Sequence, residues 1–206
     1  MNRASALAFL AGAALFGLAS GESMALDRRY PDWPCQQLKV PTIAMASIWS
    51  GPVFEATSSR SDDPKMSDLV AQLAARRTPM DEARRLIQDY VVGGAEERQG
   101  KAKALFAALF DLLNTQRDQV MTGIERFSRK EKALASDIRA NVDKLRDLQD
   151  SGQADSATID ALSKGIEWET RIFEDRAKST TYVCEVPTLI EKRLFDLGKA
   201  IQQAAK

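Results

Sequence analysis

The chain of 206 residues carries 29 basic and 29 acidic side chains, so its formal net charge is zero. Nucleic-acid-binding proteins normally show a basic excess or a basic stripe, so the balanced charge argues against nucleic acid as a partner. The chain contains no histidine and only two cysteines, which excludes the usual general base and an ordinary zinc shell. We therefore expect no metal, no cofactor and no enzyme, with catalysis by carboxylates alone as the one chemistry left open.

The first 25 residues have the pattern of a signal peptide. A short basic start precedes an uncharged run from Ala4 to Leu18, which is shorter than the roughly 20 apolar residues of a stable membrane helix. Small residues allow cleavage after Ala19 or after Ala25, of which we prefer Ala25. The sequence thus predicts export to the periplasm and a single helical domain over residues 26–206, with an uncleaved signal anchor as the alternative. No membrane-spanning segment is expected after cleavage.

Residues 26–65 are predicted to form an extended arm, because most of the prolines of the chain lie there and proline at this density prevents a long helix. The stretches Asp32–Cys35 and Ile43–Trp49 are too apolar for a free tail, so we expect the arm to lie on the helical bundle. Trp33 and Trp49 are interpreted as anchors of the arm, with a role as partner contacts as the alternative.

Residues 66–92 are predicted to form two short helices. The first covers Ser67–Arg77, with its apolar side chains on one side. The second begins with Thr78 as the capping residue and Pro79 at the first helical position. Gly93 and Gly94 end the second helix, and both helices are expected to pack at the base of the structure that follows.

Residues 95–205 are predicted to form a long antiparallel helical hairpin of the coiled-coil type. From Ala95 to about Asp150 there is no proline, and apolar residues recur every seven positions. The following turn provides Asp155 or Ser156 to cap the second helix. A second seven-residue pattern then runs from Ile159 to Ile201, so the two apolar seams match in length.

The position of the turn predicts the register of this hairpin. If the turn is centred near Gln153 and Ala154, Glu131 lies opposite Arg176. These opposite charges meet at the one layer where both seams are polar. A shift by seven residues would fit the apolar pattern equally well, so the register depends on the turn.

Cys35 and Cys184 are predicted to form an intramolecular disulfide. Export would place both thiols in an oxidising compartment, and their wide separation is unlike the Cys-x-x-Cys spacing of redox-active pairs. Pro187 cannot donate a helical hydrogen bond and is expected to kink the second long helix. A kinked helix near Cys184 is a natural place for the arm to be attached.

Three short stretches resemble a bacterial family of exported α-helical proteins that has no assigned activity. They are Trp33–Cys35, Ile48–Pro52 and Tyr182–Pro187. The resemblance implies the helical architecture over most of the mature chain and implies no chemistry.

The predicted function is that of an exported non-enzymatic interaction module, which means an adaptor, a scaffold or a chaperone-like accessory protein. It would use the surface of the hairpin to bind another envelope or periplasmic protein. Trp168 and Ile172 are the candidate contacts, because their positions lie on the outer side of the hairpin near its tip. The alternative is that Trp168 only covers the aliphatic stems of Lys164 and Arg171.

Two further interpretations concern the rest of the surface. Tyr182 and Leu189 share the outer position nearer the base and are interpreted as core. A short basic band in the first long helix is explained by ion pairing along the helix or by an anionic partner; it comprises Arg126, Arg129, Lys130 and Lys132.

The second functional hypothesis is a small-molecule or lipid-binding protein with an apolar crevice between the arm and the bundle. Trp33, Trp49, Phe54 and the face from Leu105 to Leu113 would line that crevice. A bound apolar ligand would favour this hypothesis, and a co-purifying protein would favour the interaction module.

Overall fold

The computed structural model describes residues 27–51, 64–152 and 154–206, and within these ranges the regular structure is entirely helical. In chain order the elements are η1 (Met45–Ser47), α1 (Pro64–Ala74), α2 (Met80–Tyr90), α3 (Ala95–Ser151) and α4 (Ser156–Ala204). The prediction of an all-α fold is confirmed. The predicted signal peptide and Phe54 lie outside the described residues.

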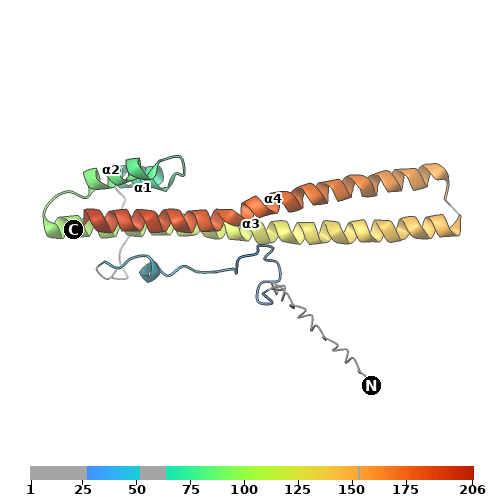
Figure 1. The fold of residues 1–206 in the computed structure, drawn as a ribbon, viewed down its shortest axis with the longest axis horizontal. Coiled ribbons are helices and arrows are strands. Elements are labelled where there is room, and N and C mark those ends of the chain that lie inside the picture. Colours follow the sequence, from blue (N-terminus) through green and yellow to red (C-terminus); the bar gives the residue numbers. More distant parts are fainter. Residues whose placement is uncertain (1–26, 52–63, 153) are drawn as a thin grey trace, which may run out of the picture.

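The two long helices α3 and α4 lie side by side, run in opposite directions and set the length of the molecule (Figure 1). At 1.5 Å per residue, the 57 residues of α3 span roughly 85 Å. Among the described residues, no helix combines the length and the apolar character needed to cross a bilayer.

Local signals at the far end of this pair determine where the chain reverses. Gly152 follows α3 with a φ of +63°, a left-handed conformation that glycine adopts without steric cost. The carboxylate of Asp155 then accepts a hydrogen bond from the N–H of Thr158 at 2.7 Å, which caps the start of α4. The predicted capping role of Asp155 is confirmed.

The register of α3 against α4 follows the position of this turn. The guanidinium of Arg176 lies 3.1 Å from the carboxylate of Glu131, as predicted. Nearer the base, Arg117 and Glu191 form a second ion pair across the two helices at 2.6 Å. Both pairs connect residues at nearly equal distances from the turn, so one register holds along the length of the pair.

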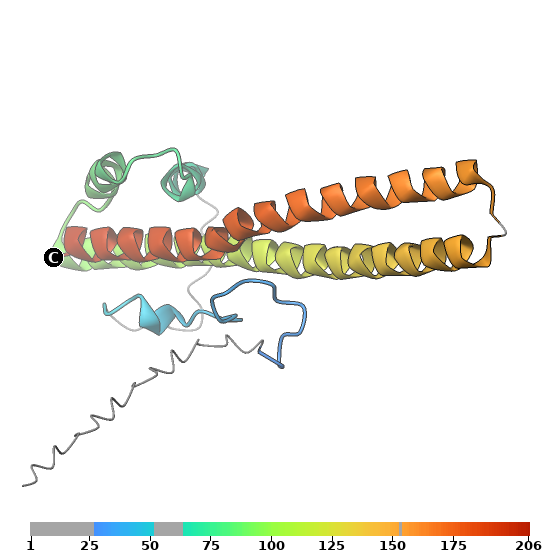
Figure 2. The same cartoon turned by 45° about the vertical axis from the view of Figure 1, so that its right-hand side comes forward.

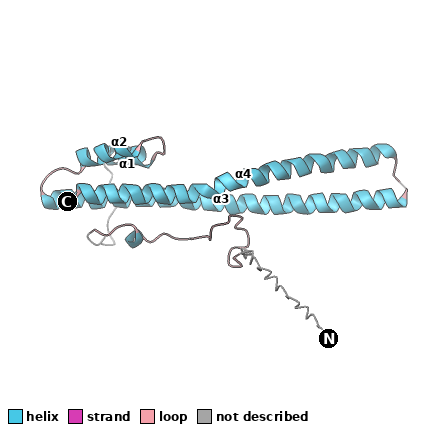
Figure 3. Ribbon diagram, viewed as in Figure 1, coloured by secondary structure: helices cyan, strands magenta, loops and turns pink. Residues whose placement is uncertain are grey.

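The hydrophobic core lies at the base, where α1 and α2 pack on α3 and α4 (Figures 1 and 3). Its most deeply buried members are Leu73, Ile87, Leu105, Phe106, Leu109, Leu113, Leu194, Leu197 and Ile201. Burying one such side chain contributes roughly 1.5–3 kcal/mol. The base is therefore the most stable part of the molecule.

The outer part of the α3–α4 pair, residues 131–180, has no such core. Among the described residues, the last buried residue of α3 is Ser128, and the first buried residue of α4 is Cys184. Apolar residues of the seam such as Leu134 and Phe173 are only half-buried. We call residues 131–180 the distal part.

The described part of the arm lies on the side of α3 and α4 opposite to α1 and α2 (Figure 2). Within residues 27–51 the regular structure consists of one short 3-10 turn, Met45–Ser47. The N–H of Trp49 donates to the carbonyl of Met45 at 3.0 Å. This turn brings the Trp49 side chain onto the core.

The predicted role of Thr78 as the cap of α2 is wrong. Pro79 occupies the capping position, and no side chain caps the helix. The Thr78 hydroxyl instead donates to the carbonyl of Gln72 at 2.7 Å, and Arg193 donates to the carbonyl of Leu73 at 2.6 Å. Thr78 thus serves the last turn of α1, whose carbonyl groups have no partner within the helix.

Candidate functional site

A disulfide between Cys35 and Cys184 joins the arm to α4, as predicted. The two sulfur atoms are 2.00 Å apart, and the Cα atoms are 5.5 Å apart. The bond attaches the arm near the middle of the α3–α4 pair, between the packed base and the distal part.

Pro187 lies one turn beyond the point where the arm meets α4. Its ring carries no N–H, so the carbonyl of Val183, four residues earlier, loses its usual helical donor. The side-chain amide of Gln37 donates to the neighbouring carbonyl, that of Cys184. α4 continues through Pro187 and changes direction in its middle (Figures 1 and 2), so the arm supplies a hydrogen bond where the helix bends.

Trp33 anchors the first part of the arm to α3. Its side chain is 5% exposed and packs against Met121 and Ile124. Its indole N–H donates to the carbonyl of Gln37 at 2.7 Å, which closes a compact loop around the disulfide.

Trp49 anchors the other described end of the arm to the core. Its side chain is 6% exposed, and its ring stacks on Phe106 with a centroid distance of 4.7 Å. Gly198 permits this close packing, because a Cβ atom at that position would lie 2.9 Å from the Phe106 ring. Like Trp33, Trp49 is almost fully buried and holds the arm on the helices.

Arg117 is a buried cation that joins three segments of the chain. Its side chain is 1% exposed. Its guanidinium pairs with Glu191 of α4 and donates to the carbonyl of Val40 in the arm. A role for this residue was not predicted from the sequence, although its position gives a signal. Arg117 lies four residues after Leu113 and seven before Ile124, within the apolar seam of α3.

The basic band of α3 is used in part by the arm. Asp32 accepts hydrogen bonds from Lys132 at 3.0 Å and from Arg129 at 3.2 Å. Lys132 also donates to the carbonyl of Pro31. These contacts give Arg129 and Lys132 intramolecular partners.

The arm should loosen in acid because of Asp32. The hydrogen bonds from Lys132 and Arg129 hold the pKa of Asp32 below its usual range. A carboxylate with a lowered pKa stabilises the fold above its unfolded pKa of about 3.9, and the stabilisation is lost as the pH falls through the lower folded value. We expect exchange of the Trp33 indole proton to accelerate below about pH 4, as followed by NMR.

The variant Asp32→Asn is the control for this pH dependence. It should exchange the Trp33 indole proton faster than the wild type at neutral pH and should show a smaller further acceleration in acid. An identical pH profile in the two proteins would show that other carboxylates cause the effect.

The exposed aromatic residues lie on the outer side of α4. Trp168 is 62% exposed, and Ile172 is half-buried. The interpretation of Tyr182 and Leu189 as core is wrong, because they are 74% and 40% exposed. Of the described segments, α1 and α2 cover the base and the arm covers the opposite side, so none of them covers these side chains.

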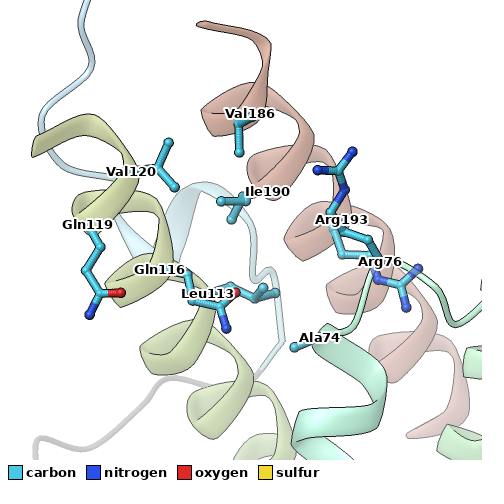
Figure 4. Close-up of a pocket in the computed structure, with 9 residues that line it drawn as sticks. All are labelled: Ala74, Arg76, Leu113, Gln116, Gln119, Val120, Val186, Ile190 and Arg193. Atoms are coloured by element: carbon cyan, nitrogen blue, oxygen red, sulfur yellow. The ribbon is translucent and has the colours of Figure 1, made fainter. Parts of the chain in front are cut away.

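The cavities of the base lie on both sides of α3 and α4. On the arm side a cavity of about 420 Å³ is lined largely by polar residues, among them Gln99, Lys199 and Gln202. Trp49 contributes to its wall, but Leu105 and Leu109 are fully buried in the core. A second cavity, of about 390 Å³, lies on the other side, beyond the end of α1 (Figure 4).

Comparisons with known proteins return no relative. No family model, no curated protein and no solved structure matches the chain.

Proposed function

We propose that the chain is an exported, non-enzymatic interaction module that acts as an adaptor, scaffold or chaperone-like accessory protein in the periplasm. Its partner is another envelope protein, which meets the distal part of the hairpin formed by α3 and α4. The observation that carries this proposal is that the distal part has no buried residue among those described, while Trp168 stands 62% exposed upon it.

A partner would gain free energy by covering this surface. Half-buried seam residues still expose apolar area, and removing such area from water is worth roughly 25 cal/mol per Å². Tryptophan is among the side chains that most often dominate binding energy. Arg171 and Lys164 pair with Glu167 and Asp160 on the same helix. The exposed Trp168 ring is therefore the side chain of this surface that a partner would most readily bind.

The base supports this function by holding one end of the hairpin rigid. The core, the disulfide and the ion pair of the buried Arg117 with Glu191 all lie between the base and the middle of the long helices. The residues that stabilise the fold therefore lie in the base, and the proposed binding residues lie in the distal part.

Export is supported by two features of the chain. The uncharged run from Ala4 to Leu18 suits a signal peptide, and the cysteines form a disulfide of the kind that persists in oxidising compartments. The proposed compartment is the periplasm.

Replacing Trp168 and Ile172 together by serine should weaken partner association while leaving the helix content nearly unchanged. If Trp168 is a dominant contact, its loss costs 2 kcal/mol or more, which weakens binding about 30-fold. Association is measured by pulldown from a native envelope extract, and helix content by circular dichroism.

Tyr182→Ser is the matched control, because Tyr182 is also an exposed aromatic residue of α4 but lies outside the distal part. This variant should bind as the wild type does. Unfolding of the Trp168 and Ile172 variant, or equal loss of binding in the Tyr182 variant, would refute a specific contact at the distal part.

A further inference from the structure

The cavity beyond the end of α1 lies in the groove between α3 and α4 and holds about 390 Å³. This volume is within the range of roughly 300–1,000 Å³ that small-molecule sites occupy. Its floor is apolar, with Leu113 and Val120 from α3 facing Val186 and Ile190 from α4 (Figure 4). An alkyl chain could lie along this floor.

The charged groups that line the cavity are both cations. Arg76 follows α1, Arg193 projects from α4, and the described residues add no carboxylate to the lining. Gln116 and Gln119 lie across the groove on α3 (Figure 4). The site therefore combines an apolar floor with positive charge on one wall.

Arg193 has no anionic partner at ion-pair distance among the described residues. Its guanidinium donates to the carbonyls of Leu73 and Thr78 at 2.6–3.0 Å. These neutral acceptors satisfy hydrogen bonds of the guanidinium but do not neutralise its positive charge. Burial lowers the pKa of Arg193, and Asp196 offsets this effect only in part. A partly buried cation with neutral partners is stabilised when an anion approaches.

We propose that this cavity binds a single-chain amphiphile with an anionic head group. The alkyl chain covers Val120, Val186 and Ile190, and the head group lies beside Arg76 and Arg193. Both a carboxylate and a phosphate monoester accept the paired hydrogen bonds that guanidinium groups donate. The site is distinct from the crevice between arm and bundle predicted from the sequence, and it lies apart from the distal part.

Binding is tested on the full chain by NMR titration of its methyl groups with dodecanoate and with dodecyl phosphate, below micelle-forming concentrations. At least one of the two should shift the methyl signals of Val120, Val186 and Ile190. The compound that binds with the lower dissociation constant identifies the preferred head group, carboxylate or phosphate. Acetate should not shift them, because it lacks the chain.

Dodecanol and dodecyltrimethylammonium test the role of charge. Both carry the same chain without the negative head group, so both should bind about fivefold or more weakly. Equal binding of the cationic amphiphile would overturn the proposal, as would dodecanoate and dodecyl phosphate both leaving these methyl signals unmoved.

Arg76→Glu and Arg77→Glu form a matched pair of variants. Both residues are exposed and both changes alter the net charge equally, but only Arg76 lines this cavity. Arg76→Glu should weaken binding of the anionic amphiphile about fivefold or more, and Arg77→Glu should leave it nearly unchanged. Equal weakening by the two variants would indicate a general charge effect and would contradict a site.

Discussion

Reduction of the Cys35–Cys184 disulfide should expose the first part of the arm to proteases well before the helices unfold. The bond closes a loop with a sequence separation of 149, and on the chain-entropy model such a bond stabilises the fold by up to about 5 kcal/mol. The arm near Cys35 has no regular secondary structure, so its position depends on side-chain contacts and on this bond. Limited proteolysis with mass mapping, with and without reductant, measures the effect.

The structure also predicts where cleavage should stop. Residues 27–38 should become cleavable, whereas Met45–Gly51 should stay protected because Trp49 is held in the core independently of the bond. A Cys35→Ser, Cys184→Ser double variant should behave like the reduced protein. Two free thiols in protein isolated from the periplasm, or an arm that stays protected after reduction, would contradict this account.

Trp49→Ala should destabilise the protein by roughly 3–5 kcal/mol, the usual cost of truncating a buried aromatic side chain. Trp49 is 6% exposed and stacks on Phe106, so its removal leaves a cavity and an uncovered ring. The free energy of unfolding from urea denaturation, compared with that of the wild type, measures this cost.

Trp168→Ala is the same chemical change at an exposed position. Because Trp168 is 62% exposed, its truncation should alter the free energy of unfolding by no more than about 0.5 kcal/mol. The pair therefore separates a tryptophan that stabilises the fold from one that is available to a partner. Similar losses of stability in both variants would place Trp168 in the core and remove the basis of the proposed contact.

The sequence predicted the features that depend on local chemistry. Asp155 was predicted as a cap of α4 because aspartate accepts hydrogen bonds from free helix N–H groups. The position of the turn predicted that Glu131 faces Arg176. The disulfide was predicted from the presence of just two cysteines in a chain whose first residues have the pattern of a signal peptide.

The features that the sequence did not predict depend on which element covers which face. Tyr182 and Leu189 have the spacing of core residues, but α1 and α2 end before they reach this face. Thr78 precedes a proline and an acidic residue, which is typical of a helix start, but its hydroxyl donates to the carbonyl of Gln72 at the end of α1. Arg117 is buried because Glu191 and the arm carbonyl of Val40 converge on it from distant parts of the chain.

The most direct test of the proposed function is site-specific photo-crosslinking in intact cells, with the photoreactive residue placed at position 168 or at position 182. Both positions are exposed on α4, so they differ in location along the helix and not in accessibility. The account predicts a discrete adduct with another envelope protein from position 168, recovered in the periplasmic fraction, and none from position 182. Retention of the protein in the cytoplasm, no adduct at position 168, or the same adducts at both positions would contradict it.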